Sequence, residues 1–481
     1  MMKKDDKFKK THPYSFIRNL RVSVVLVVLS FLQQFLFKPQ SIVEIIGSLG
    51  INALYVFAVL FYYSSSYGNY KYRLEKQGVH IKKGVFMWKD YILPYDRIYT
   101  VVFYKNLISS LFGAEKISVD TPGGFRKNYD ISEYFSRKTA IRIKKLYKRG
   151  RTLKHIYSSR IISIILMSAF WSNPVTGIVF IVPVIINIEK VIGSQFTQDI
   201  VRGTMNTQWS PIAKIISPAA AAVASLILVS WTISMLICFL RYVRLRSSVL
   251  GEHIIISRGI ISQSVTVTRT KGISTVSIEQ SLLMRILRLQ SCAVSVIGSG
   301  KLKGDKGLII AGEDKTKVHN TMTKITGIPN EEEKRINAVR GGWYSYIYSP
   351  AFFLAGLIVL TILSDIFFPL HDSILFLITV FYFILIWWLL FRIFAYRHSH
   401  LGINKKTVVL CSYDKLTLKK RFIPFDMIRK TEISQNPMQI KKGRCNLSIT
   451  VYGEKKLSFK IKQLPVKETK KLIRSINKVR Q

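Results

Sequence analysis

Six charge-poor, apolar stretches constrain the fold of this chain more than any other feature. They cover residues 22–37, 42–63, 161–188, 212–240, 347–370 and 373–395. A helix that crosses a bilayer needs about 20 mostly apolar residues, because backbone polar groups find no water in hydrocarbon. Five stretches reach that length, and the first does so if it begins at Phe16. The sequence therefore predicts six membrane-spanning helices, the third of them kinked at Pro174.

The basic residues lie almost entirely outside these stretches. The 481 residues include 72 Lys and Arg against 27 Asp and Glu, which gives a net charge of +45. Cytoplasmic loops carry the excess of Lys and Arg, and the connections within each helix pair hold few of them. The sequence thus predicts a multi-pass membrane protein, with its N-terminus and three long polar segments in the cytoplasm. The first stretch lacks a small-residue cleavage site, so we expect an uncleaved anchor.

The three long polar segments resemble one another. Each has a glycine near its start, strands with period-two alternation, an isoleucine after a polar turn, and a further strand. The corresponding residues are Gly78, Gly251 and Gly402, then Ile98, Ile273 and Ile428. Each segment closes with a helix-like pattern, such as the amphipathic "ETKKLIRSINKVRQ" at 468–481. The period of about 155 to 170 residues predicts a threefold repeat of two membrane helices followed by a small β-rich domain.

One of these segments carries a more specific signature. The stretch "RIYTVVFYKNLISSLFGAEKISVDTPGG", residues 97–124, opens with Arg-Ile, continues with Leu-Phe-Gly-Ala at 111–114 and ends with Thr-Pro-Gly-Gly at 121–124. It resembles the bacterial pleckstrin-homology-like (PH-like) domain of the bPH2, or DUF304, type. The second segment matches more loosely, with Gly272-Ile273 and Gly-Ser-Gly at 298–300. The third lacks both the Leu-Phe-Gly and the double glycine.

Three such domains, each after a helix pair, are similar to the YdbT-like membrane proteins. The resemblance implies a PH-like barrel plus C-terminal helix and a smaller single-domain relative acting beside the protein, but neither a known ligand nor a catalytic role. The expected fold class is a multi-pass α-helical membrane protein with three cytoplasmic PH-like domains, each a small β-barrel or sandwich plus a C-terminal helix. The expected division is a basic N-terminal segment with helices one and two at 1–67, PH-like domains at 68–157, 242–340 and 396–481, and helix pairs at 158–241 and 341–395.

Sequence motifs for catalysis, cofactors or metals do not emerge. The glycine cluster "VIGSGKLKGDKG" at 296–307 precedes a strand-like "LIIAG" rather than a helix, so a hairpin turn is favoured over a phosphate site. His398 and His400 are close enough to share a strand face, but no third ligand stands nearby, which favours a surface pair over a metal site. Four scattered cysteines favour free thiols. We therefore expect no enzyme activity, no cofactor and no metal.

The remaining candidate feature is positive charge beside the membrane helices and after the first Gly-Gly turn. Such cations commonly contact anionic lipid headgroups, although the positive-inside bias alone explains many that flank a helix. The candidate membrane-surface residues are Arg18, Arg21, Lys71, Arg73, Arg126, Lys127, Arg151, Lys154, Arg160, Arg241, Arg244, Arg246, Arg392 and Arg397. The expected partners are an anionic phospholipid membrane and the smaller relative, with a homo-oligomer also open. Nucleic acid is a poor candidate, because no helix-turn-helix or RNP-type pattern occurs.

Two functions from different classes fit these observations. The first is a non-enzymatic scaffold or sensor whose cytoplasmic domains bind lipid headgroups or partner proteins, in envelope integrity or in tolerance to membrane-active agents. The alternative is a lipid or peptide exporter that uses the six helices as a path. Four prolines, Pro174, Pro183, Pro211 and Pro218, interrupt the middle helix pair as in transporters with broken helices. The lack of a buried Lys or Arg or of paired carboxylates within the apolar stretches argues against a coupled pump.

Overall fold

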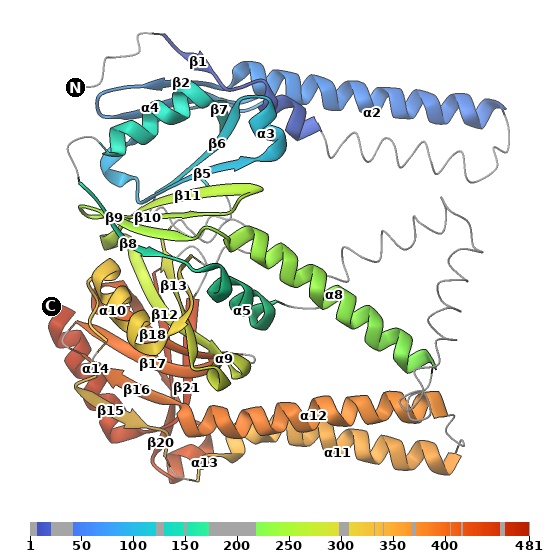
Figure 1. Ribbon diagram of the computed structural model, residues 1–481, viewed down its shortest axis with the longest axis vertical. Helices are drawn as coiled ribbons and strands as arrows, with labels where there is room; N and C mark the ends of the chain where they lie inside the picture. The colour runs from blue at the N-terminus through green and yellow to red at the C-terminus, as the bar shows by residue number, and fades with distance from the viewer. Residues whose placement is uncertain are drawn as a thin grey trace.

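A computed structural model of the chain shows three successive PH-like units. It describes residues 7–20, 42–121, 129–148, 152–172, 218–297, 307–330, 332–339, 341–367, 372–404, 406–414, 417–452 and 457–480. Within these ranges the units follow one another from the top to the bottom of Figure 1, and apolar helices project from one side of all three.

Each unit contributes seven strands and a closing helix to the described fold. The first has β1 (Lys9–Lys10), β2 (Lys71–Leu74), β3 (Gly78–Lys83), β4 (Lys89–Pro94), β5 (Thr100–Asn106), β6 (Ala114–Asp120), β7 (Ile131–Ser136) and α4 (Arg137–Lys148). The second has β8 (Leu153–Ser158), β9 (Arg246–Leu250), β10 (His253–Arg258), β11 (Ser262–Arg269), β12 (Ile273–Ser281), β13 (Leu289–Val296), β14 (Leu308–Asp314) and α10 (Lys315–Thr326). The third has β15 (Lys334–Asn337), β16 (His400–Ile403), β17 (Thr407–Asp414), β18 (Thr417–Pro424), β19 (Ile428–Ser434), β20 (Arg444–Val451), β21 (Leu457–Pro465) and α14 (Val466–Arg480).

The apolar helices are inserted into the units rather than placed before them. The helix α2 (Ile42–Asn69) lies between β1 and β2, and α5 (Ile161–Trp171) and α8 (Pro218–Tyr242) lie between β8 and β9. Similarly, α11 (Tyr344–Phe367) and α12 (Asp372–His398) separate β15 from β16. The strands on either side of each insertion pair with each other, antiparallel. The repeating unit is therefore one strand, the apolar helices, six more strands and a closing helix.

Sheets run across the boundaries between units. The first sheet has the order β1-β2-β3-β4 and the last has the order β19-β20-β21. The two middle sheets, β7-β6-β5-β11-β10-β9-β8 and β14-β13-β12-β18-β17-β16-β15, each join the last three strands of one unit to the first four of the next. The joining pairs are β5 with β11 and β12 with β18, both antiparallel. The three units thus form one row held together by backbone hydrogen bonds.

Each unit has its own apolar core, because alternate strand residues point inward from both of its sheets. The first core includes Ile81, Phe103 and Ile117, and the third includes Leu410, Leu447 and Ile476 of the closing helix. The largest, in the second unit, includes Ile254, Ile310 and Met322. The period-two alternation and the closing helices expected from the sequence are confirmed, and a strand, β14, does follow the glycine cluster.

The expectation of a six-helix multi-pass membrane protein is wrong. Among the described residues, one helical segment, Tyr344–Leu363 of α11, is long and apolar enough to cross a membrane. The helix α5 has 11 residues, fewer than the roughly 20 that a span requires. The described chain is instead rich in strands, in four sheets. Apolar composition located the apolar helices, but it did not show that α5 ends at Trp171.

Some predictions fall on residues outside the described ranges. These are most of the first apolar stretch, the kink at Pro174, the turn that follows Thr121, and Gly-Ser-Gly at 298–300. The same holds for the candidate cations Arg21, Arg126, Lys127 and Arg151.

Candidate functional site

A short helix stands between the fifth and sixth strands of every unit. These helices are α3 (Leu107–Leu111), α9 (Leu282–Ile286) and α13 (Pro437–Lys441). They begin at equivalent capping residues, Asn106, Ser281 and Asn436, whose side chains lie at the first turn. Each such cap satisfies a backbone N–H that the helix itself leaves without a partner.

A left-handed residue ends each short helix at the same place. Gly113, Arg288 and Gly443 have φ values of 66°, 56° and 61°. Glycine adopts this conformation without steric cost, which explains the glycine of the Leu-Phe-Gly signature and its return in the third unit. Arg288 is an exception that accepts the strained backbone. The signature therefore encodes a turn geometry that all three units keep, even where the residue types differ.

Large apolar side chains on these short helices are exposed to solvent. Leu111 is 86% exposed, Ile286 69% and Met438 69%. Further exposed apolar residues on or just beyond the same turns are Leu107, Ile108, Phe112, Leu287 and Ile440. Single exposed apolar residues are common on protein surfaces, but contiguous patches mark interaction sites. The repetition in three units makes a chance patch a poor explanation.

All three short helices lie where the apolar helices leave the units. Figure 1 shows α3, α9 and α13 on the side from which α2, α8, α11 and α12 project. Contacts agree with this placement. Phe112 stacks on Tyr14 at 5.4 Å between ring centroids, Arg285 of α9 contacts His398 at the end of α12 at 2.9 Å, and Lys442 lies over the ring of Tyr344 at the start of α11.

The tip of the β3–β4 hairpin adds a second apolar element in the first unit. Its sequence Gly-Val-Phe-Met-Trp at 84–88 stands between Lys82–Lys83 and Lys89. Phe86 is 84% exposed and Trp88 is 68% exposed. Phe86 stacks near Tyr62, which lies within α2 before that helix ends. We define the helix-side face as this hairpin tip together with the short helices α3, α9 and α13.

A cavity of about 840 Å³ opens beside the hairpin tip, between α2 and the sheets of the first unit. Its lining includes Lys83, Lys89 and Lys116 as well as Tyr62 and Glu133. Burial lowers the pKa of Lys116 to about 8. Burial also raises the pKa of Glu133, although a hydrogen bond from Ser15 opposes this shift. Three ammonium groups in one concave site suit an anionic group, and the acidic lining residues offset part of their positive charge.

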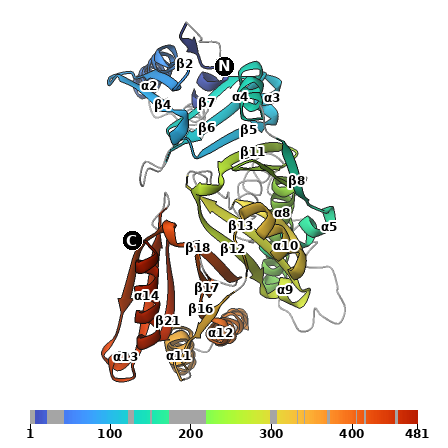
Figure 2. The ribbon, with the colours of Figure 1, turned by 90° about the vertical axis from the view of Figure 1, so that its left-hand side faces the viewer.

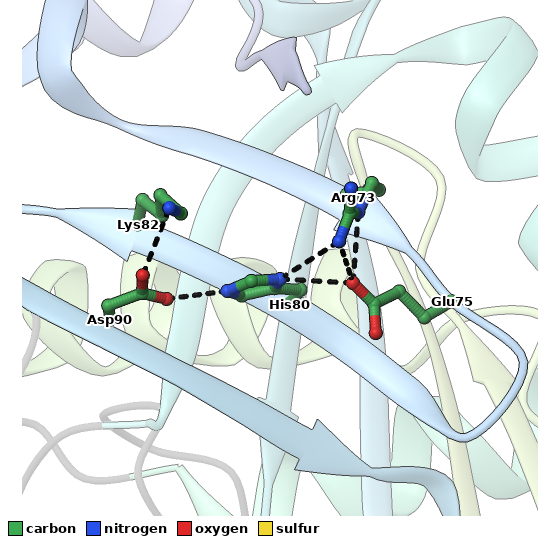
Figure 3. A network of polar contacts seen from close by, with 5 residues as sticks. All are labelled: Arg73, Glu75, His80, Lys82 and Asp90. Atoms are coloured by element: carbon green, nitrogen blue, oxygen red, sulfur yellow. Dashed lines mark hydrogen bonds and ion pairs between the residues drawn. The ribbon is translucent and has the colours of Figure 1, made fainter. Parts of the chain in front are cut away.

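A polar network covers the outer surface of the first sheet (Figure 3). Arg73 donates from Nε to Glu75 at 2.9 Å, and His80 Nδ1 lies 3.0 Å from the same carboxylate. His80 Nε2 contacts Asp90, which also pairs with Lys82 at 3.0 Å. The hydrogen bond from Arg73 lowers the pKa of Glu75, and that from His80 lowers the pKa of Asp90. Arg73, a candidate lipid-contacting residue, is thus engaged by a neighbouring carboxylate and by the ring of Phe8.

The structure separates the described candidate cations into two groups. Arg18, Arg160, Arg241, Arg392 and Arg397 lie at or near the bases of the apolar helices: Arg18 is over the ring of Tyr134, Arg160 precedes α5, Arg241 is in the last turn of α8, and Arg392 and Arg397 are on α12. By contrast, Lys71, Arg73, Lys154 and Arg246 lie on the strands β2, β8 and β9, and Arg244 just precedes β9. The first group flanks the helix-side face.

Sequence reasoning missed the apolar residues of the helix-side face. The run "KKGVFMWK" at 82–89, in which four apolar residues follow a glycine between lysines, was the available signal. His398 and His400 do not share a strand face, because the first ends α12 and the second begins β16. In the described ranges no group of three or more His, Cys, Asp or Glu could hold a metal ion. The helix-side face offers exposed apolar side chains and, at its edges, cations.

Comparison with known proteins supports the resemblance noted at residues 97–124. A family model described as the bacterial PH domain matches three times, at residues 20–151, 211–319 and 352–480. The chain belongs to the bacterial PH domain family. Each of the three matches corresponds to one PH-like unit of the structure, and PH-domain families are generally non-catalytic. No solved structure matches the chain.

A curated relative of this bacterial PH domain protein also supports the resemblance to YdbT-like proteins. The UPF0699 transmembrane protein YdbT of Bacillus subtilis (strain 168) is 20% identical over 328 residues. The match covers 63% of this chain and 65% of the relative, so the chain spans just under two thirds of the relative's length. Together with the three family matches, this confirms the YdbT-like character expected from the sequence.

Proposed function

We propose that this protein is a membrane-associated, non-enzymatic scaffold whose helix-side face lies against an anionic phospholipid bilayer. One observation carries the proposal: three units each expose large apolar side chains at equivalent turns, beside the bases of the apolar helices. The transmembrane relative supports membrane association. Three equivalent turns along one row would contact a flat surface together.

The energetics of such contact are favourable for the side chains involved. Burying a fully exposed large apolar side chain contributes about 1.5–3 kcal/mol. A cation near an anionic leaflet contributes about 1 kcal/mol, less as salt increases. Phe86, Met87 and Trp88 together with the lysines on either side combine both terms at one hairpin tip. The cavity with Lys83, Lys89 and Lys116 would accept a phosphate-bearing headgroup beside that tip.

The biological role that best fits is support of the envelope from the cytoplasmic side of the bacterial inner membrane. The net charge of +45 favours the anionic cytoplasmic leaflet. A scaffold of this kind would bind lipid headgroups and a smaller single-PH-domain relative. Deletion of the gene should then sensitise cells to membrane-active agents, and unchanged tolerance would remove this role while leaving membrane contact intact.

The membrane contact can be tested with an environment-sensitive fluorophore on Trp88→Cys in the full chain, reconstituted in vesicles. In vesicles with anionic lipid the probe should report an apolar environment. A matched control, Lys76→Cys, lies in the β2–β3 turn at the opposite end of the first sheet and should report water. The parent chain, with its four native cysteines, gives the labelling background. A water-exposed Trp88 probe in anionic vesicles would contradict the proposal.

A further inference from the structure

Two strand pairs join neighbouring units, β5 with β11 and β12 with β18, and we call them junctions. Both junctions use the same strand register. At the first, Val267 of β11 lies opposite Val101 of β5. At the second, Phe422 of β18 lies opposite Val276 of β12. Val267 and Phe422 each stand six residues before the isoleucine of the repeat in their own units, and Val101 and Val276 each stand three residues after it. The junction is therefore a repeated structural element, made twice with largely different side chains.

The row has two ends at which this element is incomplete in the described structure. The fourth strand of the first unit, β4, pairs with β3, and the fifth strand of the third unit, β19, pairs with β20. No strand of the described ranges pairs along their other edges, which we call the outer edges. Figure 2 shows the first unit at the top of the row and the third at the bottom. The outer edge of β4 corresponds to the edge that β11 and β18 use to pair with the preceding unit. The outer edge of β19 corresponds to the edge that β5 and β12 use to pair with the following unit.

We infer that β19 of one copy pairs with β4 of a second copy, so that copies associate head to tail. Applying the internal register places Ile92 opposite Thr431 and Lys89 opposite Ser434. A sheet edge with unpaired backbone groups is a template for another strand. The occupant must present the matching edge at the matching register, and a second copy of this chain carries it.

Charged residues on an edge strand do not prevent this type of pairing here. The strand β18 carries Lys419, Lys420 and Arg421 and still pairs with β12, where Lys419 lies 3.5 Å from Glu279. In the proposed ladder Lys89 takes the position of Lys419, and Ser434 takes that of Glu279. Glu432 stands diagonal to Lys89, which adds an attractive neighbour.

Two features should make the junction between copies weaker than the first internal one. At the first internal junction the backbone N–H of Arg269 donates to Tyr99 O at 3.0 Å. Pro94 holds the position of Arg269, as Pro424 does at the second internal junction, and has no N–H to donate. In addition, Arg97 and Arg429 would approach each other, since they hold the positions of Gly272 and Tyr99. We expect a reversible association that high salt favours by screening this repulsion.

The geometry of the row favours continued growth rather than a closed dimer. A head-to-tail contact uses two different surfaces, so each added copy leaves one edge of each kind available. The apolar helices of all three units project from the same side in Figure 1, despite the two junctions between them. Further junctions of the same kind would keep them there, as a membrane-bound row requires.

Cysteine cross-linking tests the register directly. Because Arg269 and Tyr99 form a hydrogen-bonded pair, the position five residues earlier on β11, which corresponds to Lys89, is non-hydrogen-bonded. Such pairs place Cα atoms close enough for a disulfide. The full chain with Lys89→Cys and Ser434→Cys should form covalent dimers and longer ladders under mild oxidation at high salt. A control pair, Lys154→Cys with Ser434→Cys, and the two single variants should not exceed the background of the native cysteines.

Proline substitution tests the backbone contact independently. In the shared register Thr431 corresponds to Val101, whose N–H points to the neighbouring unit, so Thr431→Pro removes an outward donor and spares the β20 ladder. Thr431→Val keeps the N–H and is the matched control. In sedimentation velocity of the detergent-solubilised full chain, wild type and Thr431→Val should associate with rising concentration, and Thr431→Pro should remain monomeric.

Two results would overturn the inference. The first is a wild-type chain that stays monomeric at high concentration and salt. The second is a Lys89–Ser434 cysteine pair that cross-links no better than the control pair. Circular dichroism of Thr431→Pro confirms that its fold is kept, and the cysteine pair provides a reading that does not depend on that variant. The membrane-contact probes use different residues, so either proposal can fail alone.

Discussion

The second unit and the two outer units differ in how many neighbours they have. The second unit has a strand partner on both sides, through β11 and β12. The first and third units each have one outer edge. The side chains at these edges differ accordingly. The three residues before the last one are buried on both β11 (266–268) and β18 (421–423), whereas most residues of β4 and β19 are exposed or half-buried.

The difference in packing is clearest at one position of the fourth strand. Val267 and Phe422 stand at equivalent places on β11 and β18, and each belongs to the core of the preceding unit. Ile92 is their equivalent on β4, but no unit precedes the first, and its side chain is 49% exposed. The fourth strand of each unit therefore completes the core of its neighbour. The units are interdependent, and their stability depends on their place in the row.

The largest loss of stability is expected from a substitution at the second junction. Phe422 is 0% exposed, so Phe422→Ala should lower the free energy of unfolding by about 3–5 kcal/mol, since it removes a ring from the core of the second unit. Ile92→Ala, at the equivalent outer position, should cost less than about 1 kcal/mol. Urea unfolding of the full chain in detergent provides the comparison. Equal losses for the two variants would show that the units are energetically separate.

An acid-sensitive ion pair should hold the segment between the second and third units against the strands β16 and β18. Glu332 lies 2.8 Å from Lys420 of β18 and 3.4 Å from His400 of β16. Burial alone would raise the pKa of Glu332, but the hydrogen bonds from His400 and Lys420 lower it to about 2. Burial alone would lower the pKa of His400, but hydrogen bonds to Cys411 and Glu332 raise it to about 9.

The signs of these two shifts define a pH window. A depressed carboxyl pKa stabilises the fold above the ordinary value of 4.5, and that stability is lost as pH falls toward 2. A raised imidazole pKa stabilises it below 6.5, and that stability is lost as pH rises through 9. Glu332→Gln should cost about 1.5–3 kcal/mol near pH 5.5 and much less at pH 2. A loss independent of pH in urea unfolding would contradict the ionic assignment.

A smaller loss of stability is expected from overpacking at the first junction, where the side chains differ from those at the second. A Cβ atom on Gly272 would lie 2.6 Å from the ring of Tyr99, a residue of the first unit. At the second junction the corresponding residues are Met427 and Ser274, so the large and small partners are exchanged. Gly272→Ala should cost about 1 kcal/mol through overpacking, and Tyr99→Ser should relieve it. A double-mutant cycle measures the coupling, and additive losses would show that the two positions do not meet.

The sequence predicted local elements better than their partners. Alternation and amphipathic patterns located strands such as β6 and closing helices such as α14, because these depend on neighbours in the chain. Pairing of β8 with β9 could not be predicted, since the apolar helices separate these strands by many residues. The register of β5 with β11 could not be predicted either, because these strands belong to different units. Part of the error over six spanning helices has a similar origin, because composition did not show that α5 ends at Trp171.

The candidate site was predicted in part. Basic residues such as Arg160 and Arg241 were recognised from their proximity to apolar stretches, and they do lie at helix bases. Leu111 was seen only as part of a family signature. Its exposure follows from a short helix closed by Gly113, which turns an apolar side chain outward instead of into the core. Apolar character alone would have suggested burial.

In the proposed arrangement, equivalent turns in all three units contact one lipid surface. The decisive measurement uses an environment-sensitive fluorophore placed in turn on Leu111→Cys, Ile286→Cys and Met438→Cys of the full chain in anionic vesicles. Because all three turns lie at the bases of the apolar helices, all three probes should report an apolar environment. A probe that reports water in the second or third unit, while the first reports lipid, would contradict a membrane contact shared along the row.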